Sequence, residues 1–349
     1  MEKPVDFTPA AAGYRWPAEW EPHAATWVAW PHNRHTWPGR FERIPPVFAG
    51  LVRTIAQSEP VKILAGGKQI RTLAESFVGD LANVTLLDIG TDDAWCRDNG
   101  PTFLVAPPES TLALVDWQYN AWGGKYPPFD LDNRVPWQIA EHMNCRRFQA
   151  DLVLEGGAIE GNGLGTILTT ESCLLNPNRN PGFAHRDVEQ FLSDYLDATS
   201  VVWLPRGELA GDDTDGHVDQ LARFIDPSTV VVAVAQNRLD ENFEPLQENV
   251  NFLQRARDQD GNPLRVVPLP LPAPKFLQSR RLPASYCNFY IANDLVVVPQ
   301  FEDPADEQAL RILEQLFPQR IVSGLPALEL VWGLGAFHCL TQQEPAHEG

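Results

Sequence analysis

The sequence predicts an α/β protein, because short apolar runs typical of buried strands alternate with segments whose apolar residues recur at helical spacing. Acidic and glycine-rich clusters stand next to several of these predicted strands, where connecting loops commonly carry function. The chain of 349 residues has no segment of low complexity that would separate two domains. We therefore expect one domain over residues 1–349.

The first half of the chain opens with a segment rich in tryptophan and proline. Prolines up to residue 40 favour turns, with one short strand at 25–29. The spacing of Phe48, Leu51, Val52 and Ile55 predicts a helix over 41–57. The other elements predicted in this half are strands at 61–64, 84–87, 102–105, 112–116 and 152–154, helices at 69–77 and 135–142, and a loop through 122–128.

The second half continues the same alternation. Its predicted strands lie at 165–170, 201–204, 221–225, 229–233, 264–268, 288–291, 295–298 and 320–322, and its helices at 186–195, 243–257 and 304–316. The proline-rich run 267–274 is expected to be a loop or an edge segment. A helix and two or three strands separate successive polar clusters, which indicates a repeated strand–strand–helix–strand unit. A cyclic arrangement of such units would bring the clusters to one axis.

The composition excludes some classes of partner. The net charge of −19 argues against nucleic acid or an anionic membrane and is compatible with the attraction of a small cation. The five cysteines are scattered without a Cys-x-x-Cys pair, so neither a disulfide framework nor a metal cluster is predicted. Without an N-terminal targeting pattern or an apolar run of membrane-spanning length, we expect a cytoplasmic protein.

Cys339 is the strongest candidate for a nucleophile, because it follows a glycine-rich approach that lets the backbone come close to a ligand. Its proton acceptor could be His217 or His338. On a strand, His338 would point away from its neighbour Cys339, which favours His217. Asp219 would share a face with His217 if that segment is extended.

Asp98 and Asp219 would be two carboxylates that face each other across a small cavity. Buried carboxylates without partners are unfavourable, but a planar guanidinium between them satisfies both. A metal is the alternative, although no complete ligand set with metal spacing is evident. Glu155, beside two glycines, can reach in to hold His217 in one tautomer. The remaining aspartates of these clusters fit solvated turns: Asp92, Asp93, Asp212, Asp213 and Asp215.

Six segments that span nearly the whole chain in order resemble the agmatine deiminase and Porphyromonas-type peptidylarginine deiminase family of guanidine-modifying enzymes. They are Trp16-Pro-Ala-Glu-Trp-Glu-Pro-His23, Asp92-Asp-Ala-Trp-Cys-Arg-Asp98, Asn120-Ala-Trp-Gly-Gly124, Glu155-Gly-Gly157, Gly211-Asp-Asp-Thr-Asp-Gly-His-Val-Asp219 and His338-Cys-Leu-Thr-Gln-Gln343.

The resemblance implies a five-bladed, pseudo-symmetric β/α propeller, the pentein fold, with the site on its axis. It implies that Cys339 is the nucleophile, His217 the general acid and base, and Asp98 and Asp219 the carboxylates that hold the guanidinium. Glu155 falls on the glutamate of the family's Glu-Gly-Gly motif. Substrate contacts are expected from Trp95 and Trp122. No cofactor or metal is expected.

The activity implied is the hydrolytic deimination of a small guanidino compound, agmatine to N-carbamoylputrescine and ammonia, through a covalent amidino-cysteine, as a step of putrescine synthesis. The alternatives are deimination of arginine or peptidyl arginine, an amidinotransferase, and a non-catalytic binding protein on the same fold. The expected partners are a small cationic guanidino substrate and, as a homodimer, a second copy of the chain.

The sequence departs from agmatine deiminases in loops that would line the substrate's tail. The departures are Leu334, Ala336, Phe337, Ala158 and the short segment 125–130. Free arginine as a substrate would also need a further arginine for its α-carboxylate, for which Arg97 or Arg223 are the candidates.

Overall fold

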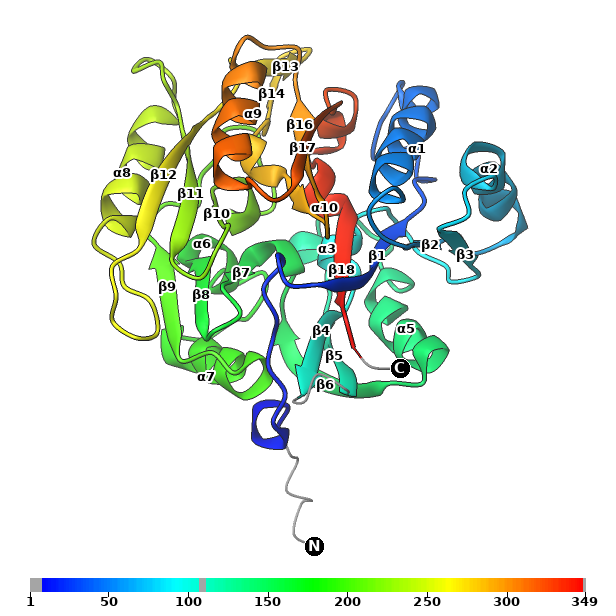
Figure 1. Cartoon of the computed structure of the whole chain (residues 1–349), viewed down its shortest axis with the longest axis horizontal. Helices are drawn as coiled ribbons and strands as arrows, with labels where there is room; N and C mark the ends of the chain where they lie inside the picture. The colour runs from blue at the N-terminus through cyan, green and yellow to red at the C-terminus, as the bar shows by residue number, and fades with distance from the viewer. Residues whose placement is uncertain (1–7, 107–110, 348–349) are drawn as a thin grey trace, which may run out of the picture.

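Small sheets surround a central region in the computed structural model, which describes residues 8–106 and 111–347 (Figure 1). Within these residues, five sheets have three or four strands and a sixth has two. The longer helices α1 (Ile44–Ile55), α2 (Lys68–Val78), α5 (Val135–Met143), α7 (His185–Leu196), α8 (Phe243–Leu253) and α9 (Ala305–Leu316) lie at the periphery. The short helices α3 (Cys96–Asn99) and α10 (Phe337–Leu340) lie near the middle.

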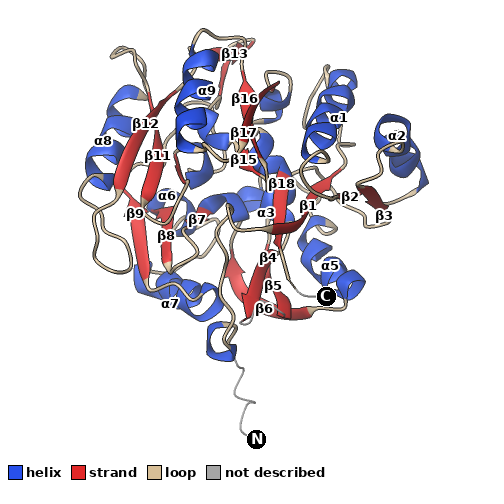
Figure 2. Ribbon diagram, viewed as in Figure 1, coloured by secondary structure: helices blue, strands red, loops and turns tan. Residues whose placement is uncertain are grey.

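The strands are short, and each sheet contains neighbours in sequence (Figure 2). The four-stranded sheet has the order β18 (Thr341–Pro345), β1 (His23–Ala29), β2 (Val61–Leu64), β3 (Val84–Leu87). The three-stranded sheets are β4 (Thr102–Ala106), β5 (Thr111–Gln118), β6 (Arg146–Val153); β7 (Ile159–Gly161), β8 (Thr166–Thr170), β9 (Ser200–Leu204); β10 (Ala222–Phe224), β11 (Thr229–Val234), β12 (Arg265–Pro270); and β15 (Tyr290–Ile291), β16 (Leu295–Gln300), β17 (Ile321–Pro326). The hairpin sheet is β13 (Lys275–Leu277) and β14 (Arg280–Leu282).

The predicted strand–strand–helix–strand unit is confirmed by the pairing of these strands. In each three-stranded sheet, the first two strands are antiparallel and the next pair is parallel. The four-stranded sheet repeats this with β18, β1 and β2, although its first strand comes from the far end of the chain. A parallel pair needs a crossover, and helices α1, α5, α7, α8 and α9 supply it.

The predicted bounds of two short strands in the first half of the chain are observed without change. The strands predicted at 61–64 and 84–87 coincide with β2 and β3. The strand predicted at 152–154 is too short, because β6 begins at Arg146, where only alternate side chains are buried. The helix predicted over 243–257 ends at Leu253. The proline-rich run is confirmed as an edge segment, since β12 continues to Pro270.

The dense tryptophans of the opening segment are packing residues. Trp27, Trp30 and Trp37 are fully buried. Trp30 packs edge-on against Phe48 of α1, with 5.4 Å between ring centroids. The opening segment therefore joins the core on which the central short helices rest.

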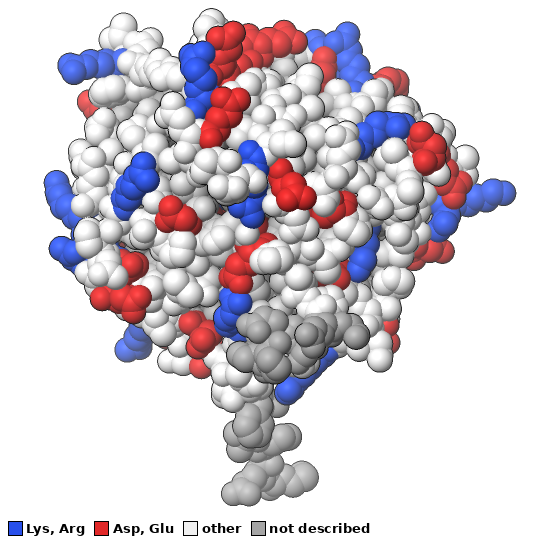
Figure 3. Space-filling model, in the orientation of Figure 1, with Lys and Arg blue, Asp and Glu red and all other residues white. Residues whose placement is uncertain are grey.

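The surface carries charge of both signs. Figure 3 shows acidic and basic side chains interspersed over one face of the molecule. Within the described residues, no helix combines the length and apolar character needed to cross a membrane.

Candidate active site

Five short helical segments, each directly before the first strand of a sheet, meet at the centre of the molecule. In chain order they are α3 before β4, η4 (Gly156–Ala158) before β7, η5 (Val218–Gln220) before β10, η6 (Tyr286–Asn288) before β15, and α10 before β18. Each segment contacts the next, and α10 contacts α3, so the contacts close into a ring. Residues hundreds of positions apart in the sequence therefore become neighbours.

This ring carries all five residues predicted to be catalytic. Asp98 lies in α3, Glu155 directly precedes η4, His217 directly precedes η5, Asp219 lies in η5, and Cys339 lies in α10. All five side chains are buried. The condition of an extended segment from His217 to Asp219 is not met, because residues 218–220 form a 3-10 turn. The argument from a strand at Cys339 does not apply either, since α10 is a single helical turn.

Gly157 is the backbone point at which three of these side chains converge. A Cβ atom at residue 157 would lie 2.6 Å from Nδ1 of His217, 2.8 Å from Oδ1 of Asp98 and 3.1 Å from Oδ2 of Asp219. Real Cβ atoms essentially never approach other heavy atoms within 3.0 Å, so the contacts with His217 and Asp98 exclude a side chain here. Only glycine at this position lets the imidazole and both carboxylates come together.

Cys339 is held beside Asp219 by an asparagine. Its Sγ lies 3.5 Å from Oδ2 of Asp219 and 3.1 Å from Nδ2 of Asn288. The same amide nitrogen donates to Oδ2 of Asp219 at 3.1 Å. Burial, reinforced by the charges of Asp219 and Asp98, raises the pKa of the Cys339 thiol well above its ordinary value. The sulfur is therefore a thiol while the site is empty.

His217 lies between two carboxylates without a hydrogen bond to either. Its Nδ1 is 3.6 Å from Oδ1 of Asp98, and its Nε2 is 3.7 Å from Oε2 of Glu155. Neither ring nitrogen has a hydrogen-bond partner among the described residues. Burial works against the cation, but the charge of Asp98 and the contacts with Cys173 and Glu155 outweigh it and raise the pKa of His217 well above its ordinary value. His217 is therefore an imidazolium at neutral pH, and an imidazolium can donate a proton.

Glu155 and Asp98 are each fixed by further contacts. Glu155 accepts from Nε of Arg179 at 2.6 Å. Asp98 accepts from Nε1 of Trp122 at 2.9 Å and from the backbone N–H of Gly157 at 3.0 Å. Burial raises the pKa of Asp98 to about 6, with Asp219 and Glu155 adding to the shift and His217 opposing it. Above about pH 6, Asp98 is therefore a buried anion that a bound cation would stabilise.

A cavity of about 660 Å³ opens onto this ring. Asp98, Cys339, Trp95 and Trp122 line it, which places both predicted substrate-contacting tryptophans at the cavity wall. His217, Asp219 and Glu155 are not among the lining residues and lie deeper. Of the segments that depart from agmatine deiminases, Leu334 and residues 126–128 line the cavity, whereas Ala158, Ala336 and Phe337 do not.

One group of side chains within residues 8–106 and 111–347 has the spacing of metal ligands: Glu155, Cys173 and His217. Arg179 already neutralises Glu155, and none of the three lines the cavity. The Sγ of Cys173 lies 3.8 Å from Oε2 of Glu155.

Arg97 and Arg223 are wrong as candidates for binding a substrate carboxylate. Both are buried and do not line the cavity. Arg97 donates to Glu19 and Gln343, and Arg223 donates to Glu19 and Glu160. Both guanidinium charges are therefore neutralised by carboxylates inside the protein.

Asn288 is the functional residue that the sequence did not reveal. It lies in η6, shortly before β15, in a position like that of the other cluster residues, although the sequence predicts a strand at 288–291. That shared position is the signal that could have found it, but the segment has no acidic or histidine residue to draw attention.

The chain resembles known proteins over nearly its full length. Residues 15–345 match the model of the Porphyromonas-type peptidyl-arginine deiminase family. An agmatine deiminase of Pseudomonas aeruginosa (strain LESB58) is 38% identical, with 99% of each chain covered, and one of Stutzerimonas stutzeri is 39% identical, with 97% of each covered. The solved structure of an Enterococcus faecalis agmatine deiminase has a TM-score of 0.92 at 32% identity, with 100% of both chains covered.

The buried Cys, His and carboxylate constellation and these matches define a guanidine-modifying enzyme of α/β fold. The chain belongs to the Porphyromonas-type peptidyl-arginine deiminase family.

Proposed function

We propose that this protein hydrolyses agmatine to N-carbamoylputrescine and ammonia, with Cys339 as nucleophile. The observation that carries the proposal is that the sulfur of Cys339 shares the cavity with Asp98 and lies 3.5 Å from Asp219. The agmatine deiminases named above, which match the chain from end to end, support agmatine as the substrate.

The guanidinium of the substrate would lie between Asp98 and Asp219. Oδ1 of Asp219 is buried and has no hydrogen-bond partner among the described residues, so it is available for a guanidinium N–H. A planar cation with a fork of N–H donors satisfies such carboxylates bidentately. The same carboxylates raise the pKa of the Cys339 thiol, and a bound cation would oppose them. Substrate binding would therefore promote thiolate formation next to the guanidinium carbon.

The reaction would proceed in two halves. The thiolate attacks the guanidinium carbon, the His217 imidazolium gives its proton to the leaving nitrogen, and ammonia departs, which leaves an amidino group on Cys339. The neutral His217 then takes one proton from water as the oxygen attacks the amidino carbon. The C–S bond breaks to release the neutral ureido product, and the departing sulfur takes up the second proton of the water and returns to the thiol. General acid–base catalysis of this kind contributes about 10²–10⁴-fold. Glu155, fixed by Arg179, supports the imidazolium in both halves.

The cavity favours a substrate with a second positive charge over free arginine. Asp92, Asp93 and Asp213 line it as further carboxylates, whereas burial raises the pKa of the lining residue Asp132 to about 8, so Asp132 is largely uncharged near neutral pH. Arg34 and Arg280 also line it, but Arg34 is paired with Glu42 at 2.6 Å and Arg280 with Asp213 at 3.2 Å. Arg97 and Arg223 are out of reach of a substrate carboxylate. An amine tail is thus better matched to this wall than a carboxylate tail.

The test is ammonia release from agmatine, free arginine and a peptidyl arginine, with Cys339→Ser as the inactive variant. Cys145→Ser is the matched control, because Cys145 is a partly buried free cysteine outside the ring and should keep full activity. Acid-quenched turnover should show the amidino adduct on the peptide that contains Cys339.

Each rival function has its own outcome in this experiment. A new guanidino compound that appears only with an added amine indicates an amidinotransferase. Ammonia from arginine but not agmatine changes the substrate. Binding without ammonia release, unaffected by Cys339→Ser, indicates a binding protein.

We also propose that the five larger sheets are the blades of one pseudo-symmetric propeller and that residues 1–349 form a single domain. The closed ring of contacts from α3 to α10 supports this arrangement. The five free cysteines of the described structure favour a reducing compartment, and we place the protein in the cytoplasm, as a homodimer. Size-exclusion chromatography with light scattering tests the assembly.

A further inference from the structure

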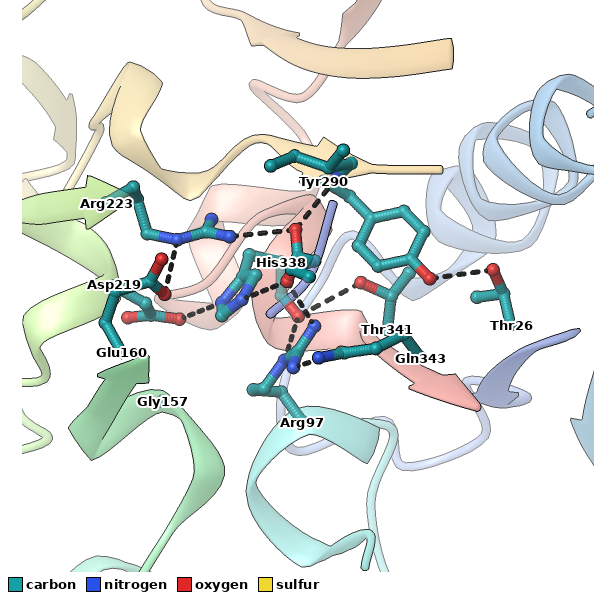
Figure 4. A network of polar contacts seen from close by, with 12 residues as sticks. Thr26, Arg97, Gly157, Glu160, Asp219, Arg223, Tyr290, His338, Thr341 and Gln343 are labelled. Atoms are coloured by element: carbon teal, nitrogen blue, oxygen red, sulfur yellow. Dashed lines mark hydrogen bonds and ion pairs between the residues drawn. The ribbon is translucent and has the colours of Figure 1, made fainter. Parts of the chain in front are cut away.

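His338, the residue before the nucleophile, bridges two buried carboxylates. Its Nδ1 lies 2.7 Å from Oδ2 of Asp219, and its Nε2 lies 2.9 Å from Oε2 of Glu19. Figure 4 shows His338 pointing toward Asp219 at the centre of a network of polar contacts. With both ring nitrogens engaged, His338 is not available as the base for Cys339.

These contacts fix the protonation of the ring. An ionised carboxylate only accepts hydrogen bonds, and a neutral imidazole has a single N–H to donate. Burial alone would raise the pKa of both carboxyl groups. Arg223, His338 and Arg97 hold the pKa of Glu19 well below its ordinary value, and the bond from His338 lowers that of Asp219. Two ionised carboxylates can both accept from His338 only if it carries both protons.

Glu19 belongs to the Trp-Pro-Ala-Glu-Trp motif, which the catalytic scheme does not use. Besides His338, it accepts from Nη2 of Arg97 at 3.0 Å, from Nη2 of Arg223 at 2.8 Å and from the backbone N–H of Ile291 at 2.9 Å. Arg223 also donates to Glu160 at 2.8 Å. A protonated His338 gives this buried network as many positive as negative charges, since two guanidiniums and one imidazolium face three carboxylates: Glu19, Glu160 and Asp219.

The network decides which oxygen of Asp219 is free. Oδ2 accepts from His338 and Asn288, whereas Oδ1 is buried without a partner among the described residues. A carboxylate anchored through one oxygen by a charged donor cannot rotate without breaking that bond. The other oxygen is thereby kept for the guanidinium of the substrate.

We propose that Glu19 and His338 are positioning residues for substrate binding: Glu19 holds the imidazole of His338 through Nε2, and His338 anchors Oδ2 of Asp219 through Nδ1, so that the free Oδ1 of Asp219 faces the guanidinium. This inference rests on the proposed function. It gives Glu19 and His338 a role in binding the substrate rather than in proton transfer.

Several other ionisable groups face this pair and take part in its titration. Those that face Asp219 are Asp98 from α3, Arg223 from β10, His217 before η5, and Cys339 from α10. Those that face His338, besides Asp219 and Glu19, are Glu160 from β7 and Arg97 from α3. All of these residues are present in both proteins, so a difference between the two proteins reports the loss of the imidazole together with its effect on these neighbours.

The test is calorimetric binding of agmatine to the inactive Cys339→Ser protein between pH 6 and pH 9, with and without His338→Gln. Glutamine keeps one donor for Asp219 but not the charge. We expect affinity to fall by about tenfold or more, as for the loss of a charge-assisted hydrogen bond. The loss should widen as the pH falls, because the pKa of Asp219 is no longer held down and the carboxylate takes up a proton. Glu19→Gln should change affinity in the same direction.

His23→Gln is the matched control. His23 is a buried histidine of the same motif that contacts Glu59 at 3.0 Å and the backbone carbonyl of Glu19 at 2.7 Å, but not Asp219. Its substitution should lower thermal stability and leave the pH dependence of agmatine binding unchanged. A pH-independent loss in His338→Gln, equal to that in His23→Gln, would overturn the proposal. Absence of agmatine binding to Cys339→Ser alone would instead count against the proposed function.

The second variant keeps the proposal falsifiable if the His338 variant does not fold. Glu19 contacts Nε2 of His338 but not Asp219, so Glu19→Gln tests the same bridge from its far end. An affinity for agmatine that is unchanged by Glu19→Gln in the Cys339→Ser protein at every pH would overturn the proposal.

Discussion

The substitution Asn288→Asp tests the electrostatics of the nucleophile with almost no change in shape. The amide nitrogen of Asn288 donates to Sγ of Cys339 and to Oδ2 of Asp219, each at 3.1 Å. The amide oxygen accepts from the backbone N–H of Ala336 at 3.1 Å, which fixes which end of the side chain faces the sulfur. The substitution therefore replaces a donor by an acceptor at the reacting atom.

The magnitude follows from the distance and the charge. Loss of a hydrogen bond to a charged group costs about 1.5–3 kcal/mol, or about 10–100-fold in rate. A negative charge 3.1 Å from the thiolate adds a repulsion of about 5 kcal/mol at an effective dielectric constant of 20. The introduced carboxyl group, buried beside Asp219, avoids this repulsion at low pH by keeping its proton and donating it. The penalty should therefore grow as the pH rises.

The assay is kcat/KM for agmatine, together with the rate of Cys339 alkylation by iodoacetamide, between pH 6 and pH 9. We expect at least a tenfold deficit at pH 6 that increases steadily toward pH 9. Asn249→Asp is the control, because Asn249 is equally buried but bonds only the backbone of Arg206. A deficit that stays constant with pH, or one shared by Asn249→Asp, would refute the reasoning.

Three further predictions concern the residues around the guanidinium. Because the pKa of Asp98 is raised to about 6, the carboxylate is lost below that pH, and agmatine should bind Cys339→Ser progressively more weakly as the pH falls through 6; calorimetry that finds stronger binding at pH 5 contradicts this. Gly157→Ala places a Cβ 2.6 Å from Nδ1 of His217 and should lower kcat by about 100-fold or more, whereas Gly50→Ala, with open space around its Cβ, should leave kcat unchanged. Trp122→Phe removes the 2.9 Å bond to Asp98 and should raise KM about tenfold, with little change in kcat; an unchanged KM would show that this bond does not orient Asp98.

Local sequence patterns predicted many of the strands and helices. The apolar run 295–298 is buried on both faces, so composition alone marks it as a strand. Strand β7 and the hairpin β13–β14 are short and polar, and no local signal distinguishes them from loops. Strand β18 exists because it pairs with β1 near the other end of the chain, a contact that no window of sequence contains.

The sequence by itself determined the family resemblance, the alternation of strands and helices, and the chemical kinds of group at the site, because these depend on residue type and near-neighbour spacing. Only the tertiary structure decided that the five short helical segments contact one another in a ring and that Asn288 reaches Cys339. It also decided that Arg97 and Arg223 form ion pairs with Glu19 instead of facing a substrate. Distances between segments far apart in the chain follow from the packing of whole sheets. Ion pairs between buried side chains from distant segments form only when those sheets have packed together.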